Sequence, residues 1–192
     1  MTDRPWESPP TGAAREIAAE IAAAVPELKT PRLRLRAPRM KDFDAFAEIL
    51  TTARGIHVGG PMPRETAWLE FTEAVSGWLL RGYGMWSVER RADGALLGFL
   101  PLHHEAGDPE PELGYLFLAS AEGQGYATEA AEAARDFAFG RLGWSRLISY
   151  IAPENARSIA VAERLGAKRA DDERHPLDAD LLIFRHPKPE SS

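Results

Sequence analysis

The segment AEGQGYATEA, residues 121–130, restricts the fold of this chain more than any other part of the sequence. Gly123 and Gly125 lie one residue apart, after an apolar alternating run and before an alanine-rich run. Alternation is typical of a strand, and an alanine-rich run is typical of a helix. The glycine pair therefore predicts a strand-to-helix junction at which the backbone lies open to close approach.

A junction of this kind is suited to binding an anion. The first turn of a helix exposes N–H groups without an internal partner, and the helix dipole makes that end positive. Glycines let a phosphate reach these groups without meeting a Cβ atom. The alternative is a tight turn with close helix packing and no ligand. Position 128 is threonine, and the loop follows a run of three consecutive predicted strands, which disfavours a dinucleotide-binding GxGxxG motif. The motif GxxxxGK[ST] is absent, so the pyrophosphate of coenzyme A is the third candidate.

The charges near the loop are mostly acidic. Glu122, Glu129 and Glu132 surround it, and Arg135 is the only opposing charge close in the sequence. We therefore expect backbone N–H groups, rather than side-chain charge, to hold any phosphate. The net charge of −6 at pH 7 disfavours nucleic acid as the main partner, because that needs a basic face.

Hydrophobic patterning along the 192 residues predicts one mixed α/β domain. In the first strand, Leu33 and Leu35 are expected to face the core and the arginines to face solvent. Asn155 and Gly166 are expected to cap and to end the last helix. The helix over 67–82 is expected to pack through Leu69, Val75, Leu79 and Leu80. The predicted strands are 32–38, 85–90, 95–104, 112–119, 145–152 and 179–186, and the predicted helices are 11–26, 42–50, 67–82, 127–142 and 155–167.

Residues 1–27 are expected to form an extension with a short helix, in which Ile17, Ile21 and Val25 recur every four residues. This helix is expected to pack on the domain or on a second subunit, or to serve in targeting. A homodimer is therefore possible on this pattern.

The chain has no cysteine, which excludes disulfides, zinc–thiolate sites and a cysteine nucleophile. Neither a membrane span nor a secretory signal is readable, so we expect no membrane partner and a cytoplasmic location.

Two separated segments together carry a family resemblance. ELGYLFLASAEGQGYATEA and NARSIAVAERLGAK resemble the GNAT superfamily of acyl-CoA-dependent N-acetyltransferases, and most of all its RimJ/RimL branch of ribosomal-protein N-terminal acetyltransferases. LKTPRLRLRAP and GYGMWSVERRADGALLGFLPL are similar to that branch's opening strand and central hairpin. The resemblance assigns a GNAT domain to residues 28–187 and implies a mostly antiparallel, twisted central sheet flanked by helices.

The resemblance has one departure. Many GNAT members carry Gln or Arg at the first position of the glycine loop, whereas this chain has Glu122, although Gly125 and Ala127 match. A carboxylate beside a pyrophosphate is expected to weaken its binding.

The resemblance implies acetyl-CoA as acyl donor and a primary amine as acceptor, with direct attack of the amine on the thioester. The pantetheine arm would pair with the edge of residues 115–118, where that strand diverges from 147–152. Asn155 would hydrogen-bond the arm in addition to capping its helix. If the strand bulges, N–H groups of Phe117 and Leu118 would face the developing oxyanion. The N–H groups expected to hold the pyrophosphate are those of Gly123, Gln124, Gly125, Tyr126, Ala127 and Thr128.

Two residues are candidates for proton transfer. Glu112 matches a cleft glutamate of the family and is the candidate base, acting through water; the alternative is an ordinary solvated glutamate at a strand end. Ser158 matches the serine of this branch and is the candidate acid that protonates the thiolate; the alternative is a polar residue in a helix's first turn. Trp86 and Tyr150 are candidates for the acceptor cleft, and core packing is the alternative for both.

The acceptor itself is not readable: a protein N-terminus and small-molecule amines both fit. The acidic residues Glu105, Asp108, Glu110 and Glu112 favour a cationic acceptor. His103, His104 and Glu105 have no further ligand at helical spacing, so no metal site is expected. A domain that binds acyl-CoA as a sensor, without turnover, and a transferase for a longer acyl group remain the alternative functions.

Overall fold

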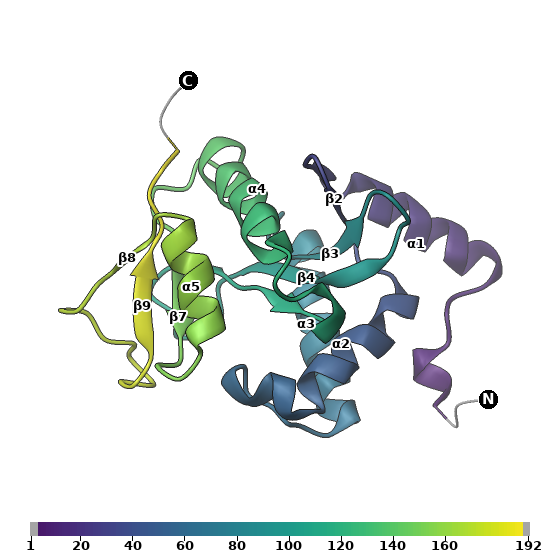
Figure 1. The fold of residues 1–192 in the computed structure, drawn as a ribbon. Coiled ribbons are helices and arrows are strands. Elements are labelled where there is room, and N and C mark those ends of the chain that lie inside the picture. Colours follow the sequence, from purple (N-terminus) through teal and green to yellow (C-terminus); the bar gives the residue numbers. More distant parts are fainter. Residues whose placement is uncertain (1–3, 190–192) are drawn as a thin grey trace.

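The computed structural model describes residues 4–189. It is a mixed α/β fold in which helices cover both faces of a twisted sheet, as the sequence predicts (Figure 1). Short 3-10 turns lie at η1 (Pro5–Glu7), η2 (Met40–Asp42), η3 (Ala53–His57) and η4 (Ala119–Ala121). The helices are α1 (Gly12–Ala24), α2 (Phe43–Leu50), α3 (Arg64–Leu80), α4 (Tyr126–Gly140) and α5 (Ala156–Arg164). The strands are β1 (Leu28–Lys29), β2 (Leu33–Arg36), β3 (Met85–Arg90), β4 (Leu96–His103), β5 (Glu112–Leu113), β6 (Leu116–Phe117), β7 (Ile148–Ile151), β8 (Lys168–Arg169) and β9 (Leu182–Arg185).

Within the described residues the strands form one sheet in the order β1-β2-β3-β4-β5-β7-β9-β8, and β6 pairs with β4. Neighbouring strands are antiparallel except β5 and β7, which are parallel. That parallel contact has a single register pair, Glu112 with Ile148. Beyond this pair, β6 remains hydrogen-bonded to β4 and β7 remains hydrogen-bonded to β9. The sheet therefore splits between β6 and β7.

The predicted strand over 112–119 is therefore two short strands with a break at Gly114 and Tyr115. Gly98 on β4 explains how β6 lies so close to its neighbour. A Cβ atom at Gly98 would come within 2.3 Å of the Leu116 carbonyl oxygen and 2.8 Å of the Phe117 Cα. Only glycine leaves room for this approach, which steers β6 toward β4 and away from β7.

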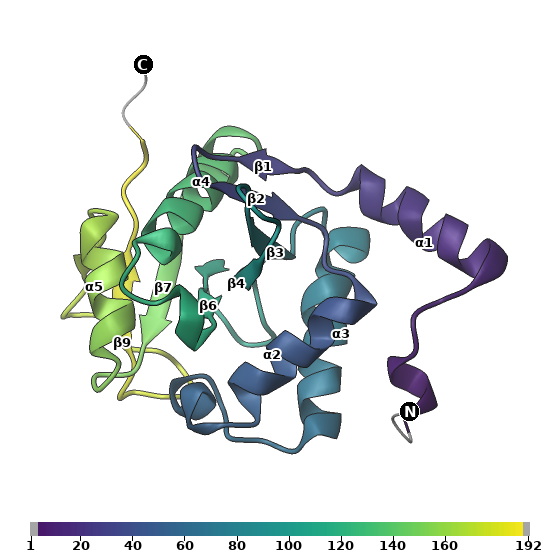
Figure 2. The same ribbon diagram turned by 45° about the vertical axis from the view of Figure 1, so that its right-hand side comes forward.

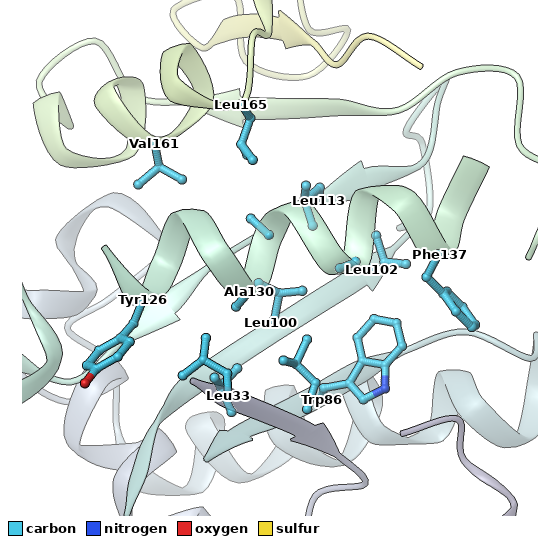
Figure 3. Close-up of a cluster of buried hydrophobic side chains, with 14 of the residues drawn as sticks. Leu33, Trp86, Leu100, Leu102, Leu113, Tyr126, Ala130, Phe137, Val161 and Leu165 are labelled. Atoms are coloured by element: carbon cyan, nitrogen blue, oxygen red, sulfur yellow. The ribbon is translucent and has the colours of Figure 1, made fainter. Parts of the chain in front are cut away.

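Each face of the sheet has its own apolar core. Helix α4 packs on the face that carries Leu33, Trp86 and Leu100 (Figure 3). Helices α2 and α3 pack on the opposite face, against Met85 and Phe99. Burial of each large apolar side chain contributes about 1.5–3 kcal/mol, so these two clusters hold the layers together.

The predicted packing face of α3 is wrong in part. Leu69, Leu79 and Leu80 are 64%, 76% and 76% exposed. The buried residues of α3 are Ala67 and Phe71, and the partly buried Val75 also packs with this cluster. Spacings of four residues place these side chains on one side of the helix, whereas the leucines fall outside that stripe.

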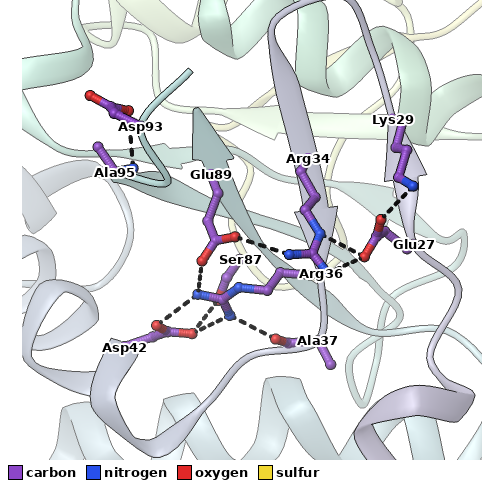
Figure 4. A network of polar contacts seen from close by, with 10 residues as sticks. All are labelled: Glu27, Lys29, Arg34, Arg36, Ala37, Asp42, Ser87, Glu89, Asp93 and Ala95. Carbon is purple, nitrogen blue, oxygen red and sulfur yellow. Dashed lines mark hydrogen bonds and ion pairs between the residues drawn. The ribbon is translucent and has the colours of Figure 1, made fainter. Parts of the chain in front are cut away.

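Arg36 also departs from the expectation that the arginines of β2 face solvent. Its side chain is 4% exposed and forms an ion pair with Asp42 at 2.6 Å and another with Glu89 at 2.6 Å (Figure 4). Ser87 donates a further hydrogen bond to Asp42. Burial raises the pKa of Asp42, but the Arg36 guanidinium outweighs burial and holds this pKa below its usual value. The cluster ties β2, β3 and the start of α2 together.

Helix α1 has no buried residue, and Ile17 and Ile21 are 57% and 53% exposed. Figure 2 shows α1 standing apart from the sheet and its covering helices. Of the alternatives expected for this helix, packing on its own domain is therefore not the one that the structure shows. The chain on either side of it is attached to the body, by Glu7 to Arg64 and by the Trp86 indole N–H to the Pro26 carbonyl. Within residues 4–189, no helix has the length and apolar character needed to cross a bilayer.

Asp42→Ala is expected to lower the free energy of unfolding by about 3–5 kcal/mol, because it leaves the Arg36 charge buried without its main partner. Asp171→Ala, which removes an exposed pair with Arg169, is the control and should have little effect. Urea unfolding measures both. Because the folded pKa of Asp42 is depressed, its contribution is present above about pH 4 and is lost as the pH falls through the folded pKa. Equal stability of the two variants at pH 7 would contradict the assignment.

Candidate active site

The glycine loop opens α4 with a row of backbone N–H groups. Gly123 and Gly125 have φ values of +71° and +75°, and Gly125 is the N-cap residue of α4. Other residues adopt this left-handed conformation only at a cost of about 1–2 kcal/mol. The first helical hydrogen bond runs from the Glu129 N–H to the Gly125 carbonyl. Among residues 4–189, no group accepts a hydrogen bond from the N–H groups of 123–128.

These N–H groups border a cavity of about 690 Å³. The cavity lies between the glycine loop, β6, α5 and η3. It brings together most of the residues predicted to hold the cofactor, and it also includes the candidate acid Ser158. Gln124 and Leu118 were predicted with them but do not line it. The predicted residues that do are Phe117, Gly123, Gly125, Tyr126, Ala127, Thr128 and Asn155.

Arg32, from the turn before β2, holds the glycine loop in place. Its guanidinium donates to the Gln124 carbonyl at 2.9 Å, pairs with Glu129 at 2.6 Å and lies over the Tyr126 ring at 4.6 Å. Thr30 donates a second hydrogen bond to Glu129. One arginine thus contacts the loop and the first turn of α4 at three residues, Gln124, Tyr126 and Glu129. These contacts preorganise the backbone N–H groups of the loop.

Side-chain charge at the cavity differs from the sequence expectation. Glu122 pairs with Arg54 of η3 at 2.7 Å and also with Arg157 of α5. The hydrogen bond from Arg54 is the main reason that the pKa of Glu122 is lowered. Arg54, Arg157 and Arg164 all line the cavity, so it is more basic than the sequence near the loop suggests. Arg54 is distant from Glu122 in the chain, and no local pattern indicates the pair.

The edge of β6 faces the cavity. The Leu118 N–H donates to the Leu97 carbonyl at 2.9 Å, so it is already used within the sheet and does not fit the predicted role toward an oxyanion. Backbone groups of successive residues point to opposite sides of a strand, which turns those of Phe117 away from β4. The Phe117 carbonyl accepts a hydrogen bond from Arg54 at 2.6 Å. The break between β5 and β6 leaves this edge of β6 without a partner strand among the described residues.

Asn155 caps α5, as predicted: its Oδ1 accepts the Ser158 N–H at 3.2 Å. Ser158 is the third helical residue, so its position in the first turn follows from the cap. The Tyr115 O–H, at the break between β5 and β6, donates to the Ser158 carbonyl at 3.0 Å. Burial raises the pKa of Tyr115, which keeps its proton in place at neutral pH. Sequence reasoning missed Tyr115 as a cavity residue.

Glu112 lies where β5 still pairs with β7, just before the sheet splits. It is not among the residues that line the cavity. Its side chain is 14% exposed. The Tyr150 N–H donates to its Oε1 at 3.1 Å, and His103 Nε2 lies 3.4 Å from its Oε2. Burial raises the pKa of Glu112 above its usual value, although His103 and the Tyr150 N–H act in the opposite direction. A carboxylate with a raised pKa is a stronger base than an ordinary one.

The structure separates the two predicted acceptor residues from the cavity. Trp86 is fully buried between Trp78 and Phe137, with ring centroids 4.6 and 5.3 Å away, so it is a core residue and the prediction for it is wrong. Tyr150 packs edge-on against His175 at 4.4 Å, outside the cavity lining. Mainly because of burial, the pKa of Tyr150 is raised to about 12.

The acidic cluster is less open than the sequence suggests. Glu110 makes two hydrogen bonds with Arg185, at 2.7 and 2.8 Å, and Asp108 lies 3.3 Å from His175. These partners, Arg185 and His175, come from the C-terminal third of the chain. The cluster therefore presents less unpaired negative charge to an acceptor than its composition implies.

Comparison with known proteins identifies the family. Residues 32–168 match the family described as "Acetyltransferase (GNAT) domain". The chain belongs to the GNAT acetyltransferase family. Acetyl transfer to an amine is the general GNAT reaction, and the family uses acetyl-CoA.

Several proteins are similar to this GNAT acetyltransferase. It is 30% identical over 149 residues to the uncharacterized protein YkkB of Bacillus subtilis, a match that covers 73% of this chain and 84% of YkkB. An acetyltransferase structure from Agrobacterium tumefaciens superposes with a TM-score of 0.82 at 36% identity, covering 86% of this chain and 96% of that one. The ribosomal L7/L12 α-N-protein acetyltransferase RimL, in complex with coenzyme A, shares the fold with a TM-score of 0.68 at 17% identity, covering 86% of this chain and all of that one.

The residues of this GNAT acetyltransferase fit an acyl-CoA. Six open N–H groups at a positive helix end suit a pyrophosphate, and Thr128 adds a buried hydroxyl without a partner in the described part of the chain. Arg54 Nε is also buried there without an acceptor. The exposed edge of β6 suits an extended chain with amide groups.

Glu122→Gln is expected to tighten coenzyme A binding about 3- to 10-fold, because the carboxylate competes with phosphate for Arg54 and Arg157. Titration calorimetry at two salt concentrations measures this, and the gain should shrink in high salt. Glu132→Gln, on the exposed side of α4, is the matched control. Weaker binding by Glu122→Gln would show instead that Glu122 holds the arginines in place for the ligand.

Proposed function

We propose that this protein transfers the acetyl group of acetyl-CoA to a primary amine by direct attack within a ternary complex. The observation that supports this most strongly is the row of open N–H groups at 123–128, which borders a cavity next to the split in the sheet. Within the GNAT family, this arrangement combines an anion site with an open strand edge. Both are needed to hold a long, phosphate-bearing acyl donor.

The chain's own groups have distinct parts in this proposal. The N–H groups of 123–128 hold the pyrophosphate, with Arg54 and Arg157 close by. The edge of Phe117 and the side chain of Asn155 bind the pantetheine arm and orient the thioester, which supplies the activated acyl carbon. The Phe117 N–H is directed away from β4 and is the backbone donor available near that carbon.

A base is needed because amines are protonated at neutral pH. Holding a peptide α-amine neutral at pH 7 costs about 1 kcal/mol, whereas a lysine amine costs about 4.6 kcal/mol. Glu112 is the proposed base. Since it does not line the cavity, it acts through a water molecule, and the Tyr150 N–H orients its carboxylate. Ser158 is the proposed donor of the proton to the departing thiolate, supported by its place in the cavity wall.

We place the protein in the RimJ/RimL-like branch, on the motifs in 112–130 and 155–168. The acceptor in this proposal is a protein N-terminus or a small-molecule amine. The transferase domain comprises residues 28–187, in a cytoplasmic protein.

The exposed isoleucines of α1 support a homodimer in which this helix meets a second subunit.

One observation favours a second candidate function. Glu122 pairs with two arginines at the cavity and offsets part of their charge, and Glu112 lies outside its lining. A protein with weak donor binding and a distant base would serve as an acyl-CoA sensor without turnover. A transferase for a longer acyl group, such as succinyl, is the remaining alternative, and competition between acyl-CoA species distinguishes it.

The experiment is thiol release from acetyl-CoA with a panel of amines: peptides with free N-termini, polyamines, amino acids and aminoglycosides. Release above background with one class establishes the transferase and identifies its acceptor class. Coenzyme A binding without release from acetyl-CoA or succinyl-CoA with any amine would favour the sensor.

Glu112→Gln is expected to lower kcat about 100-fold or more at pH 7, because it removes the base but keeps the hydrogen bond from Tyr150. The loss should become smaller at high pH, where the amine deprotonates unaided. Ser158→Ala is expected to lower kcat with little change in the KM for acetyl-CoA. The pH dependence of kcat and kcat/KM measures both effects, and an unchanged profile for Glu112→Gln would exclude it as the base.

A further inference from the structure

His103 connects the proposed base to a second carboxylate. It is the last residue of β4 and is the direct register partner of Glu112, the first residue of β5. Its Nε2 lies 3.4 Å from Glu112 Oε2, and its Nδ1 lies 3.0 Å from Glu105 Oε1. Both ring nitrogens of one imidazole therefore face carboxylate oxygens.

The three side chains become steadily more accessible to solvent. Glu112 is 14% exposed, His103 is 27% exposed and Glu105 is 64% exposed. The largely buried base thus reaches bulk water through the imidazole. A proton that Glu112 accepts has to leave before the next catalytic cycle, and burial hinders its direct release to solvent.

The charges around His103 suit it to carrying a proton. Glu105, Glu112 and Asp108 all act on it, and together they raise the pKa of His103 although burial opposes them. Asp108 is itself paired with His175, and its carbonyl contacts His104. On its other side the ring approaches the break between β5 and β6, where a Cβ atom added at Gly114 would lie 3.6 Å from His103 Nε2. Two charged side chains of the neighbouring α3 region act close by: Arg81 donates to the His104 carbonyl, and Glu70 lies near enough to Glu105 for their charges to interact. Histidine is the side chain whose ordinary pKa lies closest to neutral pH, and these carboxylates raise the pKa of His103 from there.

We propose that His103 is a proton relay that takes the acceptor amine's proton from Glu112 and passes it to solvent. This inference rests on the proposed function, with Glu112 as base. The proton that Glu112 removes from the amine moves from Glu112 Oε2 to His103 Nε2, which regenerates the carboxylate and forms an imidazolium. The imidazolium then loses one proton to water, directly or through Glu105. Only O–H and N–H bonds change, and the net product of the relay is one proton in solution.

His103→Gln tests the relay against a purely structural role. Glutamine can hydrogen-bond Glu112 but cannot carry its proton, so kcat should fall about 10- to 100-fold at pH 7 with an unchanged KM for acetyl-CoA. Added imidazole should restore part of the lost rate. In the Glu112→Gln background, the same change should cause little further loss, since the two residues act in one path. His104→Gln is the matched control and should retain wild-type rates, because its ring contacts the Asp108 carbonyl and not Glu112.

A second measurement needs no acceptor. The C–H signals of the His103 ring, assigned by their loss in His103→Gln, are followed by NMR against pH. Glu112→Gln and Glu105→Gln should each lower the pKa of His103, because each removes a facing carboxylate. His186, buried beside Ser149, should keep its titration in both variants.

The outcomes separate this inference from the proposed function. If the wild type transfers acetyl groups and His103→Gln is equally fast, or slow without rescue by imidazole, the relay is wrong and the function stands. If the pKa of His103 does not respond to Glu112→Gln, the relay is also wrong. If the wild type transfers no acyl group to any amine, the proposed function fails and the relay fails with it.

Discussion

The site depends on a single contact in the sheet, the parallel pair of Glu112 with Ile148. On one side of this pair the strands are joined, and on the other they part because β6 follows β4. Gly98 makes that departure possible, since no side chain would fit between β4 and β6. The split produces an unpaired edge at Phe117, and the joined end fixes Glu112. A sheet that continued unbroken would have neither an open edge nor a cavity.

The second physical feature is how an acidic protein forms an anion site. The N–H groups of 123–128 provide fixed partial charges that need no counter-ion, and the positive φ of Gly125 directs them into the cavity. Arg32 holds the loop through a carbonyl, a carboxylate and an aromatic ring at once. Preorganised donors lower the ordering cost of binding. Glu122 offsets two nearby arginines, which moderates this site.

Much of the fold could be predicted from the sequence, because it depends on local chemistry. The glycine loop, the Asn155 cap and the hairpin of β3 and β4 follow from residue types at short spacings. The mostly antiparallel sheet followed from the family resemblance. The N–H groups predicted at 123–128 do lie open, and most of their residues line the cavity.

The remainder depends on contacts between residues far apart in the chain. Arg54 with Glu122, and His103 with Glu112, meet only through the tertiary fold and strand register. Arg36 alternates like an exposed strand residue, yet it is buried and pairs with Asp42, which η2 supplies. The sequence left Trp86 open to a core or a cleft role, and its ring fills the space between Trp78 of α3 and Phe137 of α4. Periodicity identifies which residues share a face, and it does not say what covers that face.

The most direct test of this account is a titration of ¹⁵N-labelled protein with coenzyme A, followed through its backbone amide signals. The account predicts that the N–H signals of residues 123–128 shift together and saturate with the ligand, while those of α1 stay in place. In Arg32→Ala, the same signals should move less at equal ligand concentration. Saturable binding that leaves residues 123–128 unaffected would contradict the assignment of the glycine loop as the anion site.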